Sequence, residues 1–320
     1  MLLPKIRNLS LLLGAVLAVA ATAARAEDPV RIGGTGNYGP VLPVAAAQEL
    51  KIFDKLGVNV VFTTFASGAA SMEGLAAKEV DIINFFPPGL ALATRGGVKA
   101  TVVGAGTLTP RGWHIMVKTD SPLKNVKDLA GKKIGTSSAG STTDFFALWA
   151  GSQSGGSVTR IPVGGPGLIP NMLSGNVDAI IAYPPLSYNL MIKKDGRSIV
   201  DFGKEMPINL PDVWVASEQM IEKRPEQLRK ALTGIYSAVV YMQAHPEWSI
   251  DFIAKKTGMD KAIATEEYNN TIKGLSPDGM LKEEWVKESL KLGELAGMKE
   301  IPPAASMFTT KFVPVKPITP

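Results

Sequence analysis

Short apolar runs alternate along the first two thirds of the chain with longer segments whose apolar residues recur at helical spacing. The apolar runs include "VRIGGT" from residue 30, "DIINFF" from residue 81, "KKIGTS" from residue 132 and "DAIIAY" from residue 178. Between them lie segments such as "PVLPVAAAQELKIFDKLG", which ends at Gly57, a residue suited to a helix C-cap. Strands that alternate with helices predict an α/β fold with a mostly parallel sheet covered on both faces.

The last third of the chain has a different, almost purely helical pattern. The segment "PEQLRKALTGIYSAVVYMQAH" predicts an amphipathic helix, and its apolar stripe consists of Leu228, Leu232, Ile235, Val239 and Met242. The closing residues 301–320 contain too many prolines for a helix and predict an extended arm on the surface. We expect this helical third to complete one lobe of the fold.

Two segments that lie 97 residues apart repeat one pattern. "LAAKEVDIINFFPP" and "MLSGNVDAIIAYPP" each read as a helix end, Val-Asp, an apolar strand, an aromatic residue and Pro-Pro. The ungapped alignment pairs Asp81 with Asp178 and Phe86 with Tyr183. The repeat predicts two similar α/β lobes.

The first 26 residues have the pattern of an export signal. Lys5 and Arg7 precede an apolar run, and "ATAARA" offers an A-x-A cleavage site after Ala26. The run is shorter than the roughly 18 residues of a membrane-spanning helix. Since the chain contains no cysteine, it has neither a disulfide framework nor a lipidated Cys. We therefore expect a soluble, exported protein that is free in the periplasm.

Charge and length narrow the class further. The formal charge is +5, of which Lys5, Arg7 and Arg25 account for three, so residues 27–320 carry +2. That balance is too small to indicate nucleic-acid binding. The remaining 294 residues are enough for roughly two domains of about 150 residues each.

The loop "GTSSAGSTTDFFALWA", which begins at Gly135, is rich in small hydroxyl residues and lies between a predicted strand and a predicted helix. It is not a phosphate loop, because Ser141 stands where that motif requires lysine. It is not a nucleophile elbow, because Ala139 replaces the second glycine. With only His114 and His245 and no cysteine, no metal site or cofactor is expected.

The same loop suits recognition without chemistry. Amide groups at a helix N-terminus lack intrahelical partners and favour polar or anionic ligand groups. Small side chains with hydroxyl donors surround this terminus, namely Ser137, Ser138, Gly140, Ser141 and Thr142. In the structural alternative, Ser141 and Asp144 form a capping box, and both interpretations can hold together.

Loops of the first lobe offer comparable surfaces at the carboxyl ends of predicted strands, where open α/β sheets bind ligands. Asn37, Tyr38 and Gly39 follow the first strand, and Ser67 precedes the helix after the second. The repeated aromatic-proline pairs place Phe86 with Pro87 and Tyr183 with Pro184 at equivalent strand ends. These two aromatic rings form opposing walls of a cleft if the lobes face one another; alternatively, each packs in its own core.

With these residues in view, the sequence resembles the periplasmic solute-binding proteins of ABC importers, in the group of nitrate, alkanesulfonate, taurine and thiamine-pyrimidine-precursor binders. The resemblance covers nearly the whole chain after residue 26, through "AAAQELKIFDKLGVNVVF", "FASGAASMEGLAAKEVDI", "DSPLKNVKDLAGKKIGTSSAGS" and "MLSGNVDAIIAYPP". It implies a two-lobe, type II clamshell with two crossover hinge strands. Lobe one would comprise residues 27–115 and 215–320, and lobe two residues 116–214.

The resemblance also implies a role and a set of contacts. Such a protein is not an enzyme; it captures a small solute between its lobes and delivers it to a membrane permease with its ATPase, which it contacts peripherally. Ligand contacts carried over by position are Asn37, Tyr38, Gly39, Ser67, Phe86, Pro87, the segment from Ser137 to Thr142, Tyr183 and Trp214.

Departures from the family bear on the ligand. The cysteine-rich motif of the pyrimidine-synthesising relatives is absent, and no arginine lies in the matched loops. A small bare anion needs a cation or a dense set of donors, whereas aromatic candidates suit an organic solute, such as a sulfonate, carboxylate or pyrimidine. The alternatives are a solute-sensing subunit of a membrane receptor, and a secreted enzyme that uses His114 or Asp144.

Overall fold

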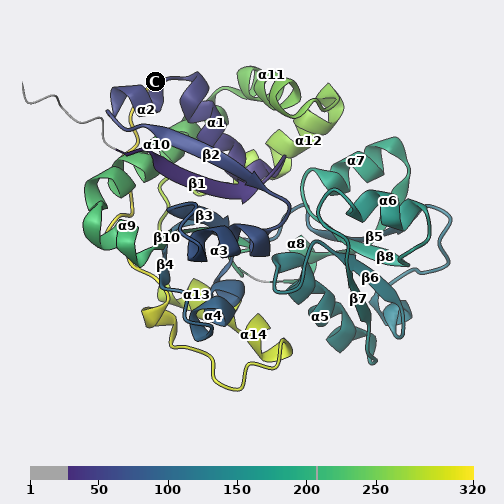
Figure 1. Cartoon of the computed structure of the whole chain (residues 1–320). Coiled ribbons are helices and arrows are strands. Elements are labelled where there is room, and N and C mark those ends of the chain that lie inside the picture. Colours follow the sequence, from purple (N-terminus) through teal and green to yellow (C-terminus); the bar gives the residue numbers. More distant parts are fainter. Residues whose placement is uncertain (1–27, 207) are drawn as a thin grey trace, which may run out of the picture.

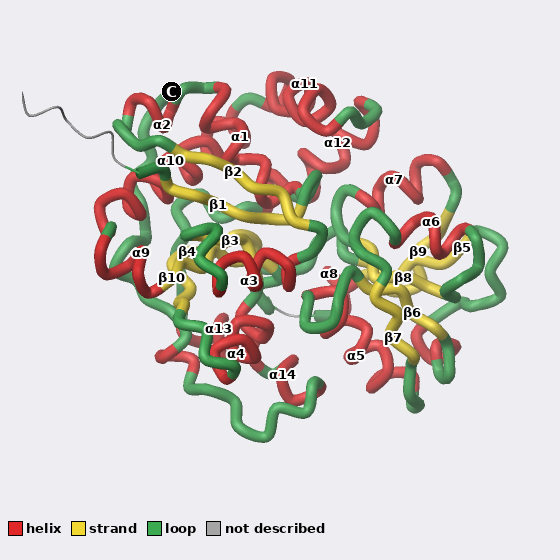
Figure 2. Tube along the Cα trace, in the orientation of Figure 1, coloured by secondary structure: helices red, strands yellow, loops and turns green. Residues whose placement is uncertain are grey.

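The computed structural model describes residues 28–206 and 208–320, so the predicted signal at 1–26 lies outside the described residues. Two five-stranded sheets, each with its own helices, lie side by side (Figures 1 and 2). The α/β, two-lobe prediction is confirmed. In the described part of the chain, no helix has both the length and the apolar character needed to cross a membrane.

The first sheet has the strand order β2-β1-β3-β10-β4. Its strands are β1 (Val30–Thr35), β2 (Val60–Phe65), β3 (Ile82–Phe85), β4 (Ala100–Thr107) and β10 (Asp212–Ser217). β1 pairs in parallel with β2 and β3, whereas β10 runs antiparallel to both β3 and β4.

The second sheet repeats this arrangement with the order β7-β6-β8-β5-β9. Its strands are β5 (His114–Lys118), β6 (Lys133–Thr136), β7 (Thr159–Pro162), β8 (Ala179–Ala182) and β9 (Gly196–Asp201). Here β5 is the antiparallel strand, paired with β8 and β9. The repeated segments therefore occupy equivalent positions at β3 and β8, as the prediction of two similar lobes requires.

Each sheet is mixed: four of its strands run in one direction, in agreement with the mostly parallel prediction, and one inserted strand runs against them. The chain leaves the first sheet after β4 and enters the second at β5; it returns after β9 and enters the first sheet at β10. β10 lies between β3 and β4, and β5 lies between β8 and β9, each antiparallel to both of its neighbours. Local periodicity carries no signal for such an insertion, because a strand's pattern is the same in either direction.

Helices cover the sheets and fill the last third of the chain. They are α1 (Leu42–Glu49), α2 (Ile52–Lys55), α3 (Gly68–Ala76), α4 (Pro87–Arg95), α5 (Thr142–Ser154), α6 (Leu168–Leu173), α7 (Leu186–Lys193), α8 (Phe202–Glu205), α9 (Glu218–Lys223), α10 (Pro225–Ala244), α11 (Pro246–Thr257), α12 (Lys261–Asn270), α13 (Glu283–Leu290) and α14 (Leu292–Leu295). The predicted stripe of α10 is buried. The extended arm runs beside β4, where the Thr309 amide donates to the Val102 carbonyl.

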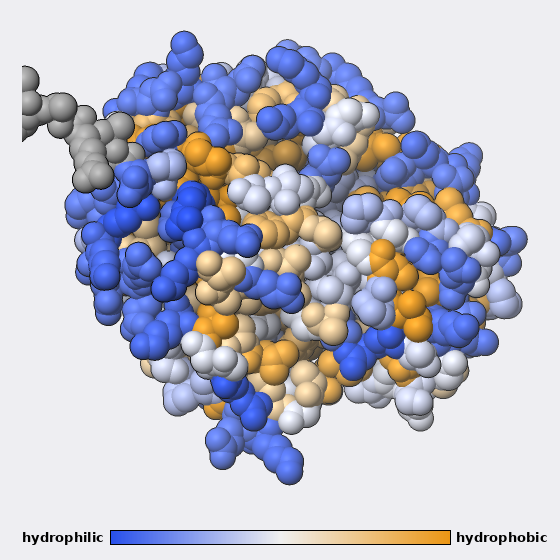
Figure 3. All heavy atoms as spheres, in the orientation of Figure 1, coloured by the Kyte–Doolittle hydropathy of each residue, from blue (hydrophilic) through white to orange (hydrophobic). Residues whose placement is uncertain are grey.

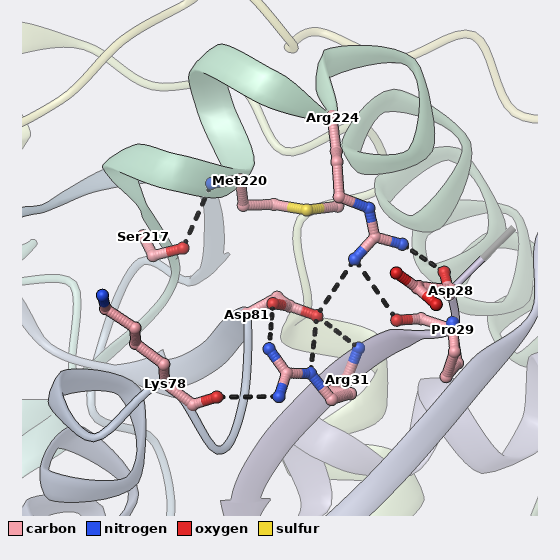
Figure 4. A network of polar contacts seen from close by, with 8 residues as sticks. All are labelled: Asp28, Pro29, Arg31, Lys78, Asp81, Ser217, Met220 and Arg224. Carbon is pink, nitrogen blue, oxygen red and sulfur yellow. Dashed lines mark hydrogen bonds and ion pairs between the residues drawn. The ribbon is translucent and has the colours of Figure 1, made fainter.

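The repeated aspartates perform the same task in both lobes. The Asp81 carboxylate accepts a hydrogen bond of 2.9 Å from the Arg31 amide in β1, and the Asp178 carboxylate accepts one of 2.7 Å from the Lys133 amide in β6. Each therefore ties one strand to the start of its parallel neighbour. Asp81 makes two further contacts: its carboxylate also binds the Arg31 guanidinium at 2.6 Å and that of Arg224 at 3.5 Å (Figure 4).

We expect Asp81→Ala to lower the free energy of unfolding by about 2–3 kcal/mol, because it leaves two guanidinium groups without their partner. The matched variant Asp178→Ala loses one exposed amide contact and is expected to cost about 1 kcal/mol. Urea denaturation followed by circular dichroism measures both. Equal losses in the two variants would contradict the structural account.

Candidate functional site

The two lobes meet around a small cavity of about 40 Å³, room for roughly three water molecules. Both lobes contribute to it, and its lining consists of Thr35, Tyr38, Gly68, Asn84, Phe85, Trp113, Ser137, Ser141, Thr142, Thr143, Tyr183 and Pro211. In Figure 3, hydrophilic residues cover the outer ends of both lobes, while weakly polar and apolar residues gather towards the junction.

Three aromatic side chains form one wall of the cavity. Tyr38 follows β1, Tyr183 follows β8 in the other lobe, and Trp113 lies on the crossing between them. Their ring centroids are 5.6–6.0 Å apart, within the range of favourable aromatic contacts. Burial raises the pKa of Tyr183 to about 12 and that of Tyr38 well above its usual value. Both phenols therefore stay neutral.

Two helix N-termini, one from each lobe, converge on the opposite side. Ser67 caps α3 by accepting a hydrogen bond of 3.1 Å from the Ala70 amide, and Ser141 caps α5. The first amides of each helix lack an intrahelical partner, and Gly68, Thr142 and Thr143 at these ends line the cavity. This side of the cavity thus presents hydrogen-bond donors and the positive ends of two helix dipoles.

The hydroxyl-rich loop is partly engaged in holding its own shape. The Oγ atoms of Ser137 and Ser141 and the Oγ1 of Thr143 lie within 2.7–3.0 Å of one another. Only half of the capping box forms, because the Asp144 carboxylate accepts from the Gly140 amide at 2.9 Å instead of from Ser141. Both interpretations of the loop therefore describe part of it: it caps α5, and it lines the cavity.

The charged groups beside this loop neutralise one another. The Arg160 guanidinium lies 2.5 Å from the Asp144 carboxylate. This pairing gives Arg160 a partner outside the cavity, which its side chain does not line. The cavity wall consequently contains no cationic side chain among the described residues.

The far end of the cavity rests on a buried carboxylate. Asp212, at the start of β10, is 1% exposed and accepts hydrogen bonds from the Thr107 hydroxyl, the Thr107 amide at 3.3 Å and the Asn84 side-chain amide at 3.4 Å. Burial raises the pKa of Asp212 to about 6, while the donors from Thr107 and Asn84 hold it lower. Asn84, which lines the cavity, links it to this carboxylate.

A wider groove of about 840 Å³ adjoins the cavity and shares Thr35 and Tyr183 with it. Apolar residues of α1 and β2 line one side, and Gly165 and Pro166 of the second lobe line the other. The Gly165 amide donates to the Ala66 carbonyl across it, at 3.2 Å. The groove gives a larger solute a path from the cavity to the surface.

The structure brings together part of the set of residues predicted from the sequence. Tyr38, Ser137, Ser141, Thr142 and Tyr183 line the cavity. At its edge, the Ser138 hydroxyl donates to the Ser67 hydroxyl of the other lobe at 2.9 Å. Gly140 supplies the turn before α5 with a φ of +73°, and Asn37 lines the adjoining groove.

Four other predicted residues lie outside the cavity lining. Phe86 does not oppose Tyr183; its ring packs on Phe145, with centroids 5.0 Å apart. Strand alternation explains this, since Phe85 and Phe86 point to opposite sides and Phe85 faces the cavity. Pro87 begins α4, and Trp214 is 2% exposed within the first sheet.

Gly39, the fourth, serves close packing. A Cβ atom on Gly39 would lie 1.6 Å from Glu267 Oε1 of α12. Only glycine lets the backbone approach this buried carboxyl group so closely.

Sequence reasoning missed seven lining residues, which are Thr35, Gly68, Asn84, Phe85, Trp113, Thr143 and Pro211. Most lie within a residue or two of a predicted position. Trp113 and Pro211 lie just before the inserted strands β5 and β10, and only the crossing of the chain brings them to the cavity.

The two histidines lie outside the cavity. His114 begins β5, is 8% exposed, and has its Nδ1 2.9 Å from the Ser198 hydroxyl. Burial lowers the pKa of His114. His245 lies between α10 and α11, where its Nδ1 is 2.8 Å from the Tyr241 carbonyl.

Known proteins share this architecture. The alkanesulfonate-binding protein SsuA from Xanthomonas axonopodis pv. citri superposes with a TM-score of 0.77 and 18% identity, over 88% of this chain and 98% of that one. A putative binding protein of Brucella abortus is 26% identical over 88% of this chain and 85% of its own length. A putative aliphatic sulfonates-binding protein of Bacillus subtilis is 26% identical over 76% of this chain and 74% of its own.

Two α/β lobes with a cavity between them, joined by two crossings of the chain, define the periplasmic binding protein fold. Within this class, residues 24–254 match the NMT1-like family. The match covers more than two thirds of the chain, and the protein belongs to this family.

Proposed function

We propose that the protein captures a small organic solute between its two lobes and delivers it to an ABC importer. The observation that carries this proposal is the cavity itself, which takes aromatic rings and helix N-termini from both lobes. Aromatic walls with a few placed polar groups are typical of small-molecule sites. The names of two relatives support a sulfonate, and the aromatic wall suits a carboxylate or pyrimidine-like solute as well.

In this proposal, closure works by a shift of population. A solute that touches both lobes binds the closed form more tightly than the open form, and so favours closure. Contacts across the cavity, such as Ser138 with Ser67, form only when the lobes meet. The closed surface is then what a membrane permease with its ATPase recognises, in the periplasm after removal of residues 1–26.

The lobe boundaries belong to the same proposal. Residues 27–115 with 215–320 move as lobe one, and residues 116–214 as lobe two, apart from residues 114–115, which pair in the second sheet, and residues 212–214, which pair in the first. β5 pairs wholly within the second sheet and β10 wholly within the first, so the hinge itself lies in the segments that precede these two strands.

Binding is favoured over turnover by the surroundings of the two candidate catalytic groups. His114 contacts Ser198 outside the cavity, and the Asp144 carboxylate is engaged by Gly140 and Arg160. A sensing role at a membrane receptor uses the same closed form, and a neighbouring permease and ATPase in the genome distinguishes import from sensing.

A thermal-shift screen of the mature protein tests the proposed function. Its panel holds sulfonates, taurine, nitrate, pyrimidines and aromatic carboxylates, and a ligand at 100 times its Kd adds about 2.7 kcal/mol of stability. We expect a solute that raises Tm in the wild type and binds at least tenfold more weakly to the double variant Ser137→Ala, Ser141→Ala. The control Ser152→Ala, Ser174→Ala removes two hydroxyls far from the cavity and should bind normally. Unchanged affinity in the first variant would remove this loop from the site.

A further inference from the structure

The buried carboxylate beneath the cavity determines which way a neighbouring amide faces. Every contact that Asp212 makes with Thr107 and Asn84 is one in which the carboxylate accepts. An ionised carboxylate has no proton to donate, so the Asn84 side chain must turn its NH2 group towards it. The Oδ1 atom of Asn84 is left on the other side of the amide plane.

That oxygen is available to a ligand. Asn84 lines the cavity and is 6% exposed, and no described residue donates a hydrogen bond to its Oδ1. The Tyr38 hydroxyl, on the same lobe, is buried beside Asp212 and helps to lower the pKa of that carboxyl. Because a polar atom that is closed off from water without a partner costs free energy, the Asn84 Oδ1 favours a ligand that offers it a hydrogen-bond donor.

Two parts of the cavity lining therefore differ in hydrogen-bonding character. Around Asn84 the wall offers an acceptor backed by a buried carboxylate, and around Gly68, Thr142 and Thr143 it offers amide donors at helix N-termini. An anion made only of acceptor atoms, such as an unsubstituted alkanesulfonate or nitrate, satisfies the amide donors and leaves the Asn84 acceptor unpaired. A solute with a donor at one end and an acceptor at the other satisfies both.

We propose that Asp212 is a positioning residue that fixes the Asn84 Oδ1 as an acceptor, and that this pair selects solutes carrying an amino or amide N–H group opposite their oxyanion, carbonyl or ring-nitrogen acceptor. The inference rests on the proposed function and assigns its substrate class. It assigns no contact to Asp212 itself, which acts through Asn84.

Matched pairs of probes that differ by one amino group test this selection. The pairs are taurine with ethanesulfonate, 4-aminobenzoate with benzoate, and 4-amino-2-methylpyrimidine with 2-methylpyrimidine. We expect the amino member of at least one pair to bind the wild type at least tenfold more tightly by isothermal titration calorimetry. A des-amino member that binds as well as its partner in every pair would overturn the proposal, and so would a solute found in the wider screen that has no N–H group.

Variants separate positioning from mere support of the fold. In Asp212→Asn the side chain at position 212 can donate as well as accept, so it no longer fixes the orientation of the Asn84 amide. We expect the preference for the amino member to fall below about threefold. Thr107→Val is the control: it removes another hydrogen bond to Asp212, leaves the Asn84 amide facing it, and should keep the preference. If Asp212→Asn fails to fold, Asn84→Ala takes its place. It removes the acceptor directly and should weaken the binding of the amino member only. An unchanged preference in Asp212→Asn and Asn84→Ala would refute the role of both residues.

Different results would refute the proposed function and the proposed selection by Asn84. If an anion without N–H groups binds and closes the lobes, the proposed function stands and the selection by Asn84 falls. If no solute of any class binds in the thermal-shift screen, the proposed function itself falls and the selection falls with it.

Discussion

Replacing Glu267 by glutamine is expected to raise the stability of the protein above pH 6 and to remove most of its pH dependence there. Glu267 on α12 is fully buried between the lobes, next to Gly39 and Thr271, and neither carboxyl oxygen has a hydrogen-bond partner among the described residues. Burial raises the pKa of Glu267 to about 8, from an ordinary 4.5. The acid is thus stable in this position only with its proton.

The direction of the effect follows from linkage. The folded state binds this proton more tightly than the unfolded state, so the stability is fully present below pH 4.5 and is lost as the pH rises towards 8. At 1.36 kcal/mol for each pKa unit, the full loss is about 5 kcal/mol, of which about 2 kcal/mol falls between pH 6 and pH 8. Asp212 has a pKa of about 6, so its contribution changes mainly below that window.

Urea denaturation of the wild type and Glu267→Gln between pH 6 and pH 9 measures this difference. We expect the free energy of unfolding to fall in the wild type and to stay nearly level in the variant. Glu266→Gln, one residue earlier and exposed, is the control and should behave as the wild type. Parallel curves for the wild type and Glu267→Gln would show that Glu267 ionises freely in the folded protein.

The environment of Glu267 illustrates what local sequence patterns do not contain. The helical spacing around it is ordinary, yet α12 contacts α7 of the second lobe, and the burial of Tyr188 opposite raises that phenol's pKa as well. The carboxyl group is buried because the two lobes meet there. Residue type and periodicity indicate the helix, but they do not indicate that α7, from another part of the chain, packs against it.

By contrast, the elements that depend on neighbours in sequence were predictable. The Val-Asp repeat identified β3 and β8, and the stripe from Leu228 to Met242 identified α10, since each follows from a period of two or 3.6 residues. The hydroxyl-rich loop was recognised because a helix start has a local signature. The contributions of Trp113 and Pro211 to the cavity were not recognised, because each depends on a crossing of the chain between the lobes.

We expect Trp113→Ala to have the largest effect on solute binding, with a Kd at least 30-fold higher. Trp113 is 5% exposed, and its ring packs against Tyr38 of one lobe and against Tyr183 and Phe146 of the other. Truncating a central, desolvated tryptophan typically costs 2 kcal/mol or more of binding free energy. The same change removes core packing, so unfolding should become about 3–5 kcal/mol easier.

Trp149→Ala separates the two effects, because Trp149 packs on Phe202, with ring centroids 5.3 Å apart, and lies away from the cavity. Both variants should unfold at lower urea concentrations, but only Trp113→Ala should bind the solute more weakly in isothermal titration calorimetry. A similar loss of affinity in both would mean that binding follows the stability of the second lobe. A loss confined to Trp113→Ala would place the aromatic wall in contact with the solute, at the point where the chain passes from one lobe to the other.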